Sequence, residues 1–220
     1  MSERVHLTAN DGHELEAYVA RPEGESIAGL VIVQEVFGIN THIRSVTDGY
    51  AKDGFLAIAP ALFDRYERGV ELGYEGADMQ KAMSFARKLD IDAAVRDTAA
   101  ALDYVRNQTG KKCGVIGYCL GGTLAWLAAT RLKADAAVGY YGGRIEMFAS
   151  EQPQSPVMLH FGKEDEHIPK ENVDTVAQAH PEVEIYWYDN AGHGFNRQGS
   201  EAPAKLARAR SVEFLKKHLS

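Results

Sequence analysis

The hydrophobic and polar positions of the chain form short apolar runs separated by longer amphipathic stretches. Buried strands are predicted at 29–34, 55–59, 112–116, 136–139, 157–161 and 183–188. Helices are predicted between them at 42–53, 79–89, 91–106, 123–129, 170–179 and 202–218. This alternation predicts an α/β fold, a mainly parallel, doubly wound sheet with helices on both faces and a site at the carboxyl ends of the strands.

The first twenty residues follow a different pattern. Val5–Leu7 and Leu15–Val19 flank the turn sequence Asn10-Asp11-Gly12, which predicts an N-terminal antiparallel hairpin. Residues 61–75 show neither period and are expected to form an irregular connection. We expect one domain over residues 1–220, because α/β domains of roughly 200–250 residues commonly remain undivided.

One cysteine lies where a predicted strand turns into a predicted helix, in Gly117-Tyr118-Cys119-Leu120-Gly121-Gly122. This arrangement resembles the nucleophile elbow of α/β-hydrolases, with sulfur in place of the usual serine oxygen. Glycines suit such an elbow because its backbone is strained and the strand and helix approach closely. The N–H of Leu120 begins the helix and is a predicted oxyanion donor.

A thiol that acts as a nucleophile needs a base, and the base needs an acid that orients it. His193 is the candidate base, because glycines flank it and it follows the last predicted strand. Asp165 is the candidate acid and completes the order nucleophile, acid, histidine that is typical of this fold. Glu164 and Asp189 are rival acids, and His167 is expected to face solvent.

Glu35 directly follows the strand at 29–34, where the loop of this fold supplies a second oxyanion donor, here the N–H of Val36. The Glu35 carboxylate is either a second base for the thiol or a solvated group at a strand end. Arg197 lies four residues after His193 and could balance Glu35 or hold a substrate carboxylate, although many such arginines are surface charges.

Composition narrows the possible partners. The chain has 24 basic and 31 acidic residues, a formal net charge of −7, and no basic run, so nucleic acid is not an expected partner. The N-terminus lacks a signal peptide and no apolar run is long enough to span a bilayer, so we expect a cytoplasmic protein without membrane contact. We also expect the protein to be a monomer. We expect no metal and no cofactor, because the histidines lack HxH or HExxH spacing.

The two cysteines are expected to stay reduced. If 113–119 is one extended strand, their Cα atoms lie about 20 Å apart, which is too far for a disulfide. The sequence has no CxxC motif, so a thiol-disulfide enzyme is disfavoured, and Cys113 is interpreted as a small buried hydrophobe.

Four segments together resemble the dienelactone hydrolase family: Gln34 to Asn40, Gly117 to Gly122, Gly162 to Asp165 and Gly192 to Arg197. The resemblance covers nearly the whole chain and implies a cysteine hydrolase of lactones or esters with a role in aromatic compound degradation. It implies that Cys119, His193 and Asp165 form a triad. It also implies that Glu35 takes the thiol proton when substrate displaces it from Arg197. The family's named activity converts a dienelactone to maleylacetate.

The chain departs from the best-known members at the substrate-binding residues. An ungapped alignment puts Met79 where a second arginine for the substrate carboxylate is expected, Met83 where a tyrosine is expected, and Gly194 where serine is familiar. Because two arginines hold a carboxylate far better than one, these changes leave the natural substrate open.

The aromatic residues at predicted strand ends and loops could line a pocket for a compact acyl group: Phe37, Phe63, Tyr140, Tyr141 and Phe195. The leading hypothesis is a cofactor-free carboxylic-ester hydrolase that acts on a small lactone or ester, with Phe37, Tyr140 and Arg197 as substrate contacts. The rival hypothesis is a non-catalytic or redox-sensing thiol protein on the same fold.

Overall fold

The computed structural model describes residues 1–197 and 201–220, and its centre is one eight-stranded sheet in the order β1-β2-β4-β3-β5-β6-β7-β8. The strands β1 and β2 pair antiparallel, as do β2 and β4, and the other neighbours are parallel. This confirms the predicted α/β fold and its N-terminal hairpin. The strands are β1 (Ser2–Thr8), β2 (Glu14–Ala20), β3 (Ala28–Val33), β4 (Phe55–Pro60), β5 (Cys113–Tyr118), β6 (Ala136–Tyr140), β7 (Val157–Gly162) and β8 (Glu184–Tyr188).

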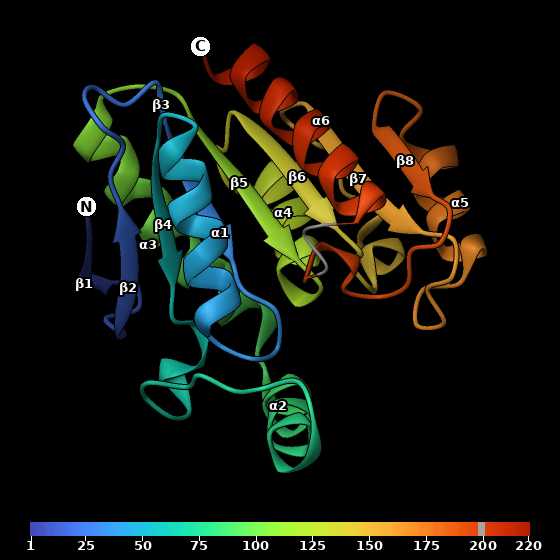
Figure 1. Ribbon diagram of the computed structural model, residues 1–220, viewed down its shortest axis with the longest axis horizontal. Coiled ribbons are helices and arrows are strands. Elements are labelled where there is room, and N and C mark those ends of the chain that lie inside the picture. The colour runs from blue at the N-terminus through green and yellow to red at the C-terminus, as the bar shows by residue number, and fades with distance from the viewer. Residues whose placement is uncertain (198–200) are drawn as a thin grey trace.

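Helices cover both faces of the sheet. The α-helices are α1 (Thr41–Lys52), α2 (Gly76–Lys88), α3 (Ile91–Thr109), α4 (Leu120–Arg131), α5 (Lys170–Ala179) and α6 (Ala202–Leu219). Figure 1 shows α1 and α6 in front of the sheet and α3 and α4 behind it. The helix α2 stands away from the sheet, beyond the end at which β4 terminates. Among the described residues, no helix is both long enough and apolar enough to cross a bilayer.

The parallel strands β3, β5, β6 and β7 are buried along their whole length. Their continuous apolar runs are what helices on both faces require. The predicted irregular connection at 61–75 contains a short 3₁₀ turn, η1 (Leu62–Arg65). Two further 3₁₀ turns are η2 (Ile145–Phe148) and η3 (Phe195–Arg197).

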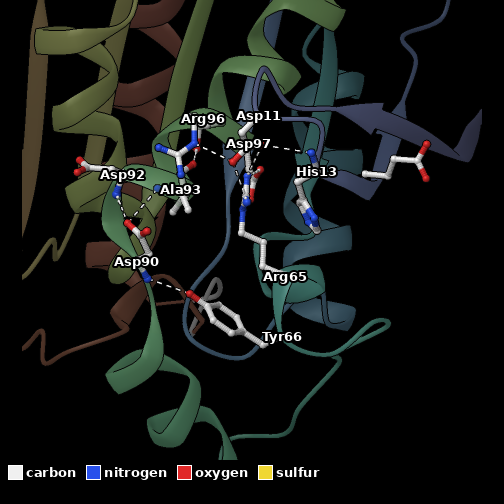
Figure 2. Close-up of polar contacts among 12 residues, drawn as sticks. Asp11, His13, Arg65, Tyr66, Asp90, Asp92, Ala93, Arg96 and Asp97 are labelled. Atoms are coloured by element: carbon white, nitrogen blue, oxygen red, sulfur yellow. Dashed lines mark hydrogen bonds and ion pairs between the residues drawn. The ribbon is translucent and has the colours of Figure 1, made fainter.

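A partly buried ionic cluster connects the beginning of this segment to the rest of the fold (Figure 2). Arg65 donates two hydrogen bonds, of 2.8 and 2.7 Å, to the fully buried carboxylate of Asp97 on α3. It also pairs with Asp11 in the β1–β2 turn, and Asp11 in turn accepts from Arg96 on α3. The cluster therefore connects three segments of the fold, namely η1, the β1–β2 turn and α3.

Candidate active site

Cys119 lies at the turn from β5 into α4 with φ 54° and ψ −114°, a conformation that side-chain-bearing residues rarely adopt. The glycines around it are required by space. A Cβ on Gly117 would lie 1.8 Å from the carbonyl oxygen of Gly121, and a Cβ on Gly121 would lie 2.3 Å from that of Val33. The close approach of strand and helix thus holds the half-buried thiol at the carboxyl end of the sheet.

The structure brings the three predicted triad residues together from three strand ends. His193 Nε2 lies 3.1 Å from Cys119 Sγ, and His193 Nδ1 lies 2.8 Å from Asp165 Oδ2. The Asp165 side chain is 2% exposed and that of His193 is 21% exposed, so the acid is shielded while the base can reach solvent. Such a chain of contacts can move a proton between sulfur and imidazole.

The electrostatics of His193 follow from this geometry. Burial alone lowers its pKa, but the hydrogen bonds with Asp165 and Cys119 outweigh burial and raise the pKa to about 10. At neutral pH the histidine therefore carries a proton, and its positive charge stabilises a negatively charged sulfur.

The rival acids lie elsewhere. The Asp189 carboxylate is largely exposed and pairs with Lys163 at 2.7 Å, and Glu164 is exposed. His167 is exposed, as expected, but its ring packs edge-on against the ring of His193 with centroids 5.1 Å apart.

The loop after β3 lies close to the elbow, since the Gly121 Cα packs against the last residues of that strand. The buried Gln34 side chain donates to the carbonyl of Glu35 at 3.1 Å and accepts from the N–H of Leu62 at 3.2 Å. In the part of the chain that the structure describes, neither the Val36 N–H nor the Leu120 N–H donates a hydrogen bond to another residue. Both N–H groups therefore remain candidates for binding an oxyanion.

Glu35 is 1% exposed, and its Oε2 atom has no hydrogen-bond partner among the described residues. Burial raises the pKa of this carboxyl, although the charges of Arg197 and His193 and the hydroxyls of Tyr74 and Tyr141 oppose the shift. A carboxyl with a raised pKa can accept and release a proton nearer to neutral pH.

Arg197, at the end of η3, lies over this carboxyl. Its Nε atom is 3.9 Å from Glu35 Oε1, an ion-pair distance that is too long for a hydrogen bond. The same Nε donates to the carbonyl of Gly194 at 3.2 Å, and Nη2 donates to the carbonyl of His193 at 3.3 Å. This contact fits the interpretation that Arg197 balances the charge of Glu35.

Tyr74 is a neighbour of the site that sequence reasoning missed. The Arg197 guanidinium lies 4.5 Å above the Tyr74 ring, and the Phe37 ring packs edge-on against it with centroids 4.6 Å apart. The Asn40 side-chain amide donates to the Tyr74 hydroxyl at 3.1 Å. Phe37 itself is 5% exposed and also lies under Arg197, at 5.9 Å.

The prediction for Tyr140 needs correction. Its side chain is fully buried, and its hydroxyl lies 2.6 Å from Ser211 Oγ of α6, so it packs in the core instead of lining a substrate pocket. The next residue, Tyr141, lies on the site side with its ring centroid 5.1 Å from that of His193. Tyr141 follows the last residue of β6 with φ 37°, so the backbone has left the strand conformation where this side chain turns to the site.

The remaining sequence observations have plain structural counterparts. Cys113 is buried and both cysteines are free. Met79 packs against an apolar cluster that includes Phe37 and Phe85, whereas Met83 is 44% exposed. Over residues 1–197 and 201–220, no group of three or more histidine, cysteine or acidic side chains is arranged to hold a metal ion.

The sequence is similar to known proteins over almost its whole length. The model of the dienelactone hydrolase family matches residues 15–219. The chain is 33% identical to a carboxymethylenebutenolidase of Pseudomonas putida over 227 aligned positions, which cover 98% of this chain and 96% of that protein.

Solved structures share the fold. A crystal structure from Klebsiella pneumoniae superposes with a TM-score of 0.83 at 26% identity, covering 97% of this chain and 98% of that one. A dienelactone hydrolase-like promiscuous phosphotriesterase from metagenomic libraries has a TM-score of 0.77 at 20% identity. The superposition covers 100% of this chain and 99% of that one.

Proposed function

Since the chain belongs to the dienelactone hydrolase family and is a carboxylic-ester hydrolase, we propose that it cleaves a small lactone or ester through a covalent bond to Cys119. The observation that carries the proposal is the continuous line from Asp165 through His193 to the sulfur, with contacts of 2.8 and 3.1 Å. The strained backbone at Cys119 supports it, because such strain is typical of a nucleophile elbow.

In the first half of the reaction, the Cys119 sulfur attacks the carbonyl carbon and the carbonyl π electrons move to oxygen. The N–H groups of Leu120 and Val36 hold the resulting oxyanion. As the carbonyl reforms, the bond to the leaving oxygen breaks and the His193 imidazolium donates its proton to that oxygen. The products of this half are an acyl thioester on Cys119 and a free hydroxyl.

In the second half, neutral His193 removes a proton from a water molecule, which attacks the thioester carbonyl. The second oxyanion uses the same two N–H groups, and collapse expels the sulfur as thiolate beside the reprotonated imidazole. Asp165 keeps the imidazole in one tautomer and orientation throughout. Glu35 is proposed as an auxiliary acid-base group for the thiol, supported by its burial and its unpaired oxygen.

Replacing the two cysteines separately tests this proposal. Cys119→Ala should lower kcat for a small ester such as ethyl acetate by at least about 10³-fold, because the covalent route is lost. Cys113→Ala is the matched control and should keep turnover, since this cysteine is buried in the core. Undiminished hydrolysis by Cys119→Ala would overturn the proposal. A burst of acylation by 4-nitrophenyl acetate without turnover would favour the rival, a non-catalytic thiol protein.

A further inference from the structure

We infer that Arg197 is a fixed structural cation of the site, and that the enzyme therefore selects uncharged lactones and esters over substrates that carry a carboxylate. This inference rests on the proposed function and names its substrate class. It is drawn from the surroundings of the Arg197 side chain in the described residues, which hold the guanidinium on several sides at once.

The first restraint is the backbone of the His193 loop. Two guanidinium nitrogens of Arg197 donate to the carbonyls of Gly194 and His193. A substrate carboxylate that took these donors would leave the His193 carbonyl without its partner, while the Gly194 carbonyl would keep only the backbone N–H of Arg197 at 3.0 Å. Binding an anion here thus competes with the positioning of His193.

The second restraint is steric and lies at Gly194. This residue has φ +76°, and a Cβ built on it would lie 1.9 Å from Arg197 Nη2. The positive φ favours glycine at this position, and a side chain here would push the flexible end of Arg197 away from its present place.

The third restraint is the aromatic ring of Tyr74, 4.5 Å below the guanidinium. The Tyr74 hydroxyl accepts from Asn40, the residue that caps α1 by accepting from the N–H of Ile43. The segment before Tyr74 is fixed as well, because the N–H of Leu72 donates to the carbonyl of Phe37 at 2.9 Å. Tyr74 is a positioning residue that acts through Arg197.

The surroundings also disfavour an incoming anion. The buried carboxyl of Glu35 lies 3.9 Å from Arg197 Nε, so it already occupies the position of a counter-charge. A substrate carboxylate at Arg197 would lie beside it. Met79, which replaces the second arginine, packs into an apolar cluster. An uncharged acyl group meets none of these penalties.

The test compares two five-membered lactones that differ only in a carboxylate or a carboxamide on the same ring carbon, with turnover followed by acid release in a pH-stat. Wild type should hydrolyse the carboxamide with a kcat/KM about tenfold or more higher, and the difference should lie mainly in KM. An equal or greater kcat/KM for the carboxylate would overturn the inference.

Two variants of Tyr74 distinguish loss of the contact with Arg197 from a general loss of stability. Tyr74→Leu removes the ring and should lower KM for the carboxylate lactone, so the ratio of kcat/KM between the carboxamide and carboxylate lactones should decrease at least threefold. Tyr74→Phe keeps the ring and should leave this ratio unchanged. Gly194→Ala displaces the guanidinium directly and should narrow the preference too, which provides a second variant if Tyr74→Leu folds poorly. A preference that neither variant changes would overturn the assignment of these restraints.

Arg197→Ala tests directly whether Arg197 binds the substrate carboxylate or supports the His193 loop. If Arg197 binds substrate, this variant loses activity selectively on the carboxylate, and the inference fails. If Arg197 braces the His193 loop, both lactones lose kcat to a similar extent. Absence of turnover with either lactone in wild type, together with no acylation of Cys119 by 4-nitrophenyl acetate, would instead overturn the proposed function on which the inference rests.

Discussion

The protonated state of His193 predicts how activity falls at high pH. The imidazolium must protonate an alkoxide leaving group, and its fraction decreases as pH rises through the His193 pKa of about 10. We therefore expect kcat/KM for ethyl acetate to stay high above pH 7 and to fall near pH 10. A 4-nitrophenolate leaving group departs without a proton, so kcat/KM for 4-nitrophenyl acetate should not fall in that range.

Replacing Asp165 by Asn shows how far this carboxylate raises the pH at which activity declines. The hydrogen bond from the imidazolium to this carboxylate is 2.8 Å long and almost completely buried. A hydrogen bond to a charged group contributes about 1.5–3 kcal/mol, and about 1.4 kcal/mol corresponds to one pKa unit. The decline of the ethyl acetate profile should therefore move down by about one to two pH units in Asp165→Asn.

The assay is kcat/KM for both esters from pH 6 to 11 in wild type, Asp165→Asn and Asp189→Asn. Asp189 is the matched control, because its exposed carboxylate pairs with Lys163 and not with the histidine. The reasoning is refuted if the ethyl acetate profile of Asp165→Asn still declines near pH 10. It is also refuted if both esters lose activity together in wild type, since leaving-group protonation would then not be responsible.

Three further predictions concern buried groups. If Glu35 must be ionised for activity, kcat/KM falls as pH drops through its raised pKa, above the ordinary value of 4.5, and Glu35→Gln removes this acid limb; an unchanged limb would assign it to another group. Arg65→Met should lower the free energy of unfolding in urea by about 3–5 kcal/mol, because Asp97 stays buried without its partner. The double variant Arg65→Met/Asp97→Leu should recover most of that loss, and no recovery would contradict this cause. Burial lowers the pKa of His160 to about 3, so the unfolded chain takes up its proton first and stability falls as pH drops from 6.5 to 3. Urea titrations of His160→Gln should show a shallower acid loss than wild type, and equal slopes would exclude His160 as the source.

The fold and the main site residues could be predicted because their signals are local. The elbow glycines, the strand before Cys119 and the order of Cys119, Asp165 and His193 are all read within a few residues of each position. The prediction for Tyr140 failed because a strand end with two tyrosines gives no sign of which one faces the core.

The neighbours of Arg197 could not be found in this way. Tyr74 lies in the connection at 61–75, which has no hydrophobic period, and its contact with Arg197 joins residues more than a hundred positions apart. The pairing of Arg65 with Asp97 and Asp11 likewise joins three separate segments. The one local signal was Gly194, because its backbone conformation, with φ +76°, favours glycine and it lies against the Arg197 side chain.

The charges of the site give an independent argument for an uncharged substrate. The Cys119 sulfur and the carboxyl groups of Asp165 and Glu35 already face the two cationic side chains of the site, His193 and Arg197. A substrate carboxylate that lies about 5 Å from any one of these groups in its ionised form would be disfavoured by about 3 kcal/mol at an effective dielectric constant of ~20. A neutral lactone adds no charge, because attack transfers the negative charge of the sulfur to the carbonyl oxygen. There the two backbone N–H groups of the oxyanion site receive it, so the reaction proceeds without changing the net charge that the buried groups have to balance.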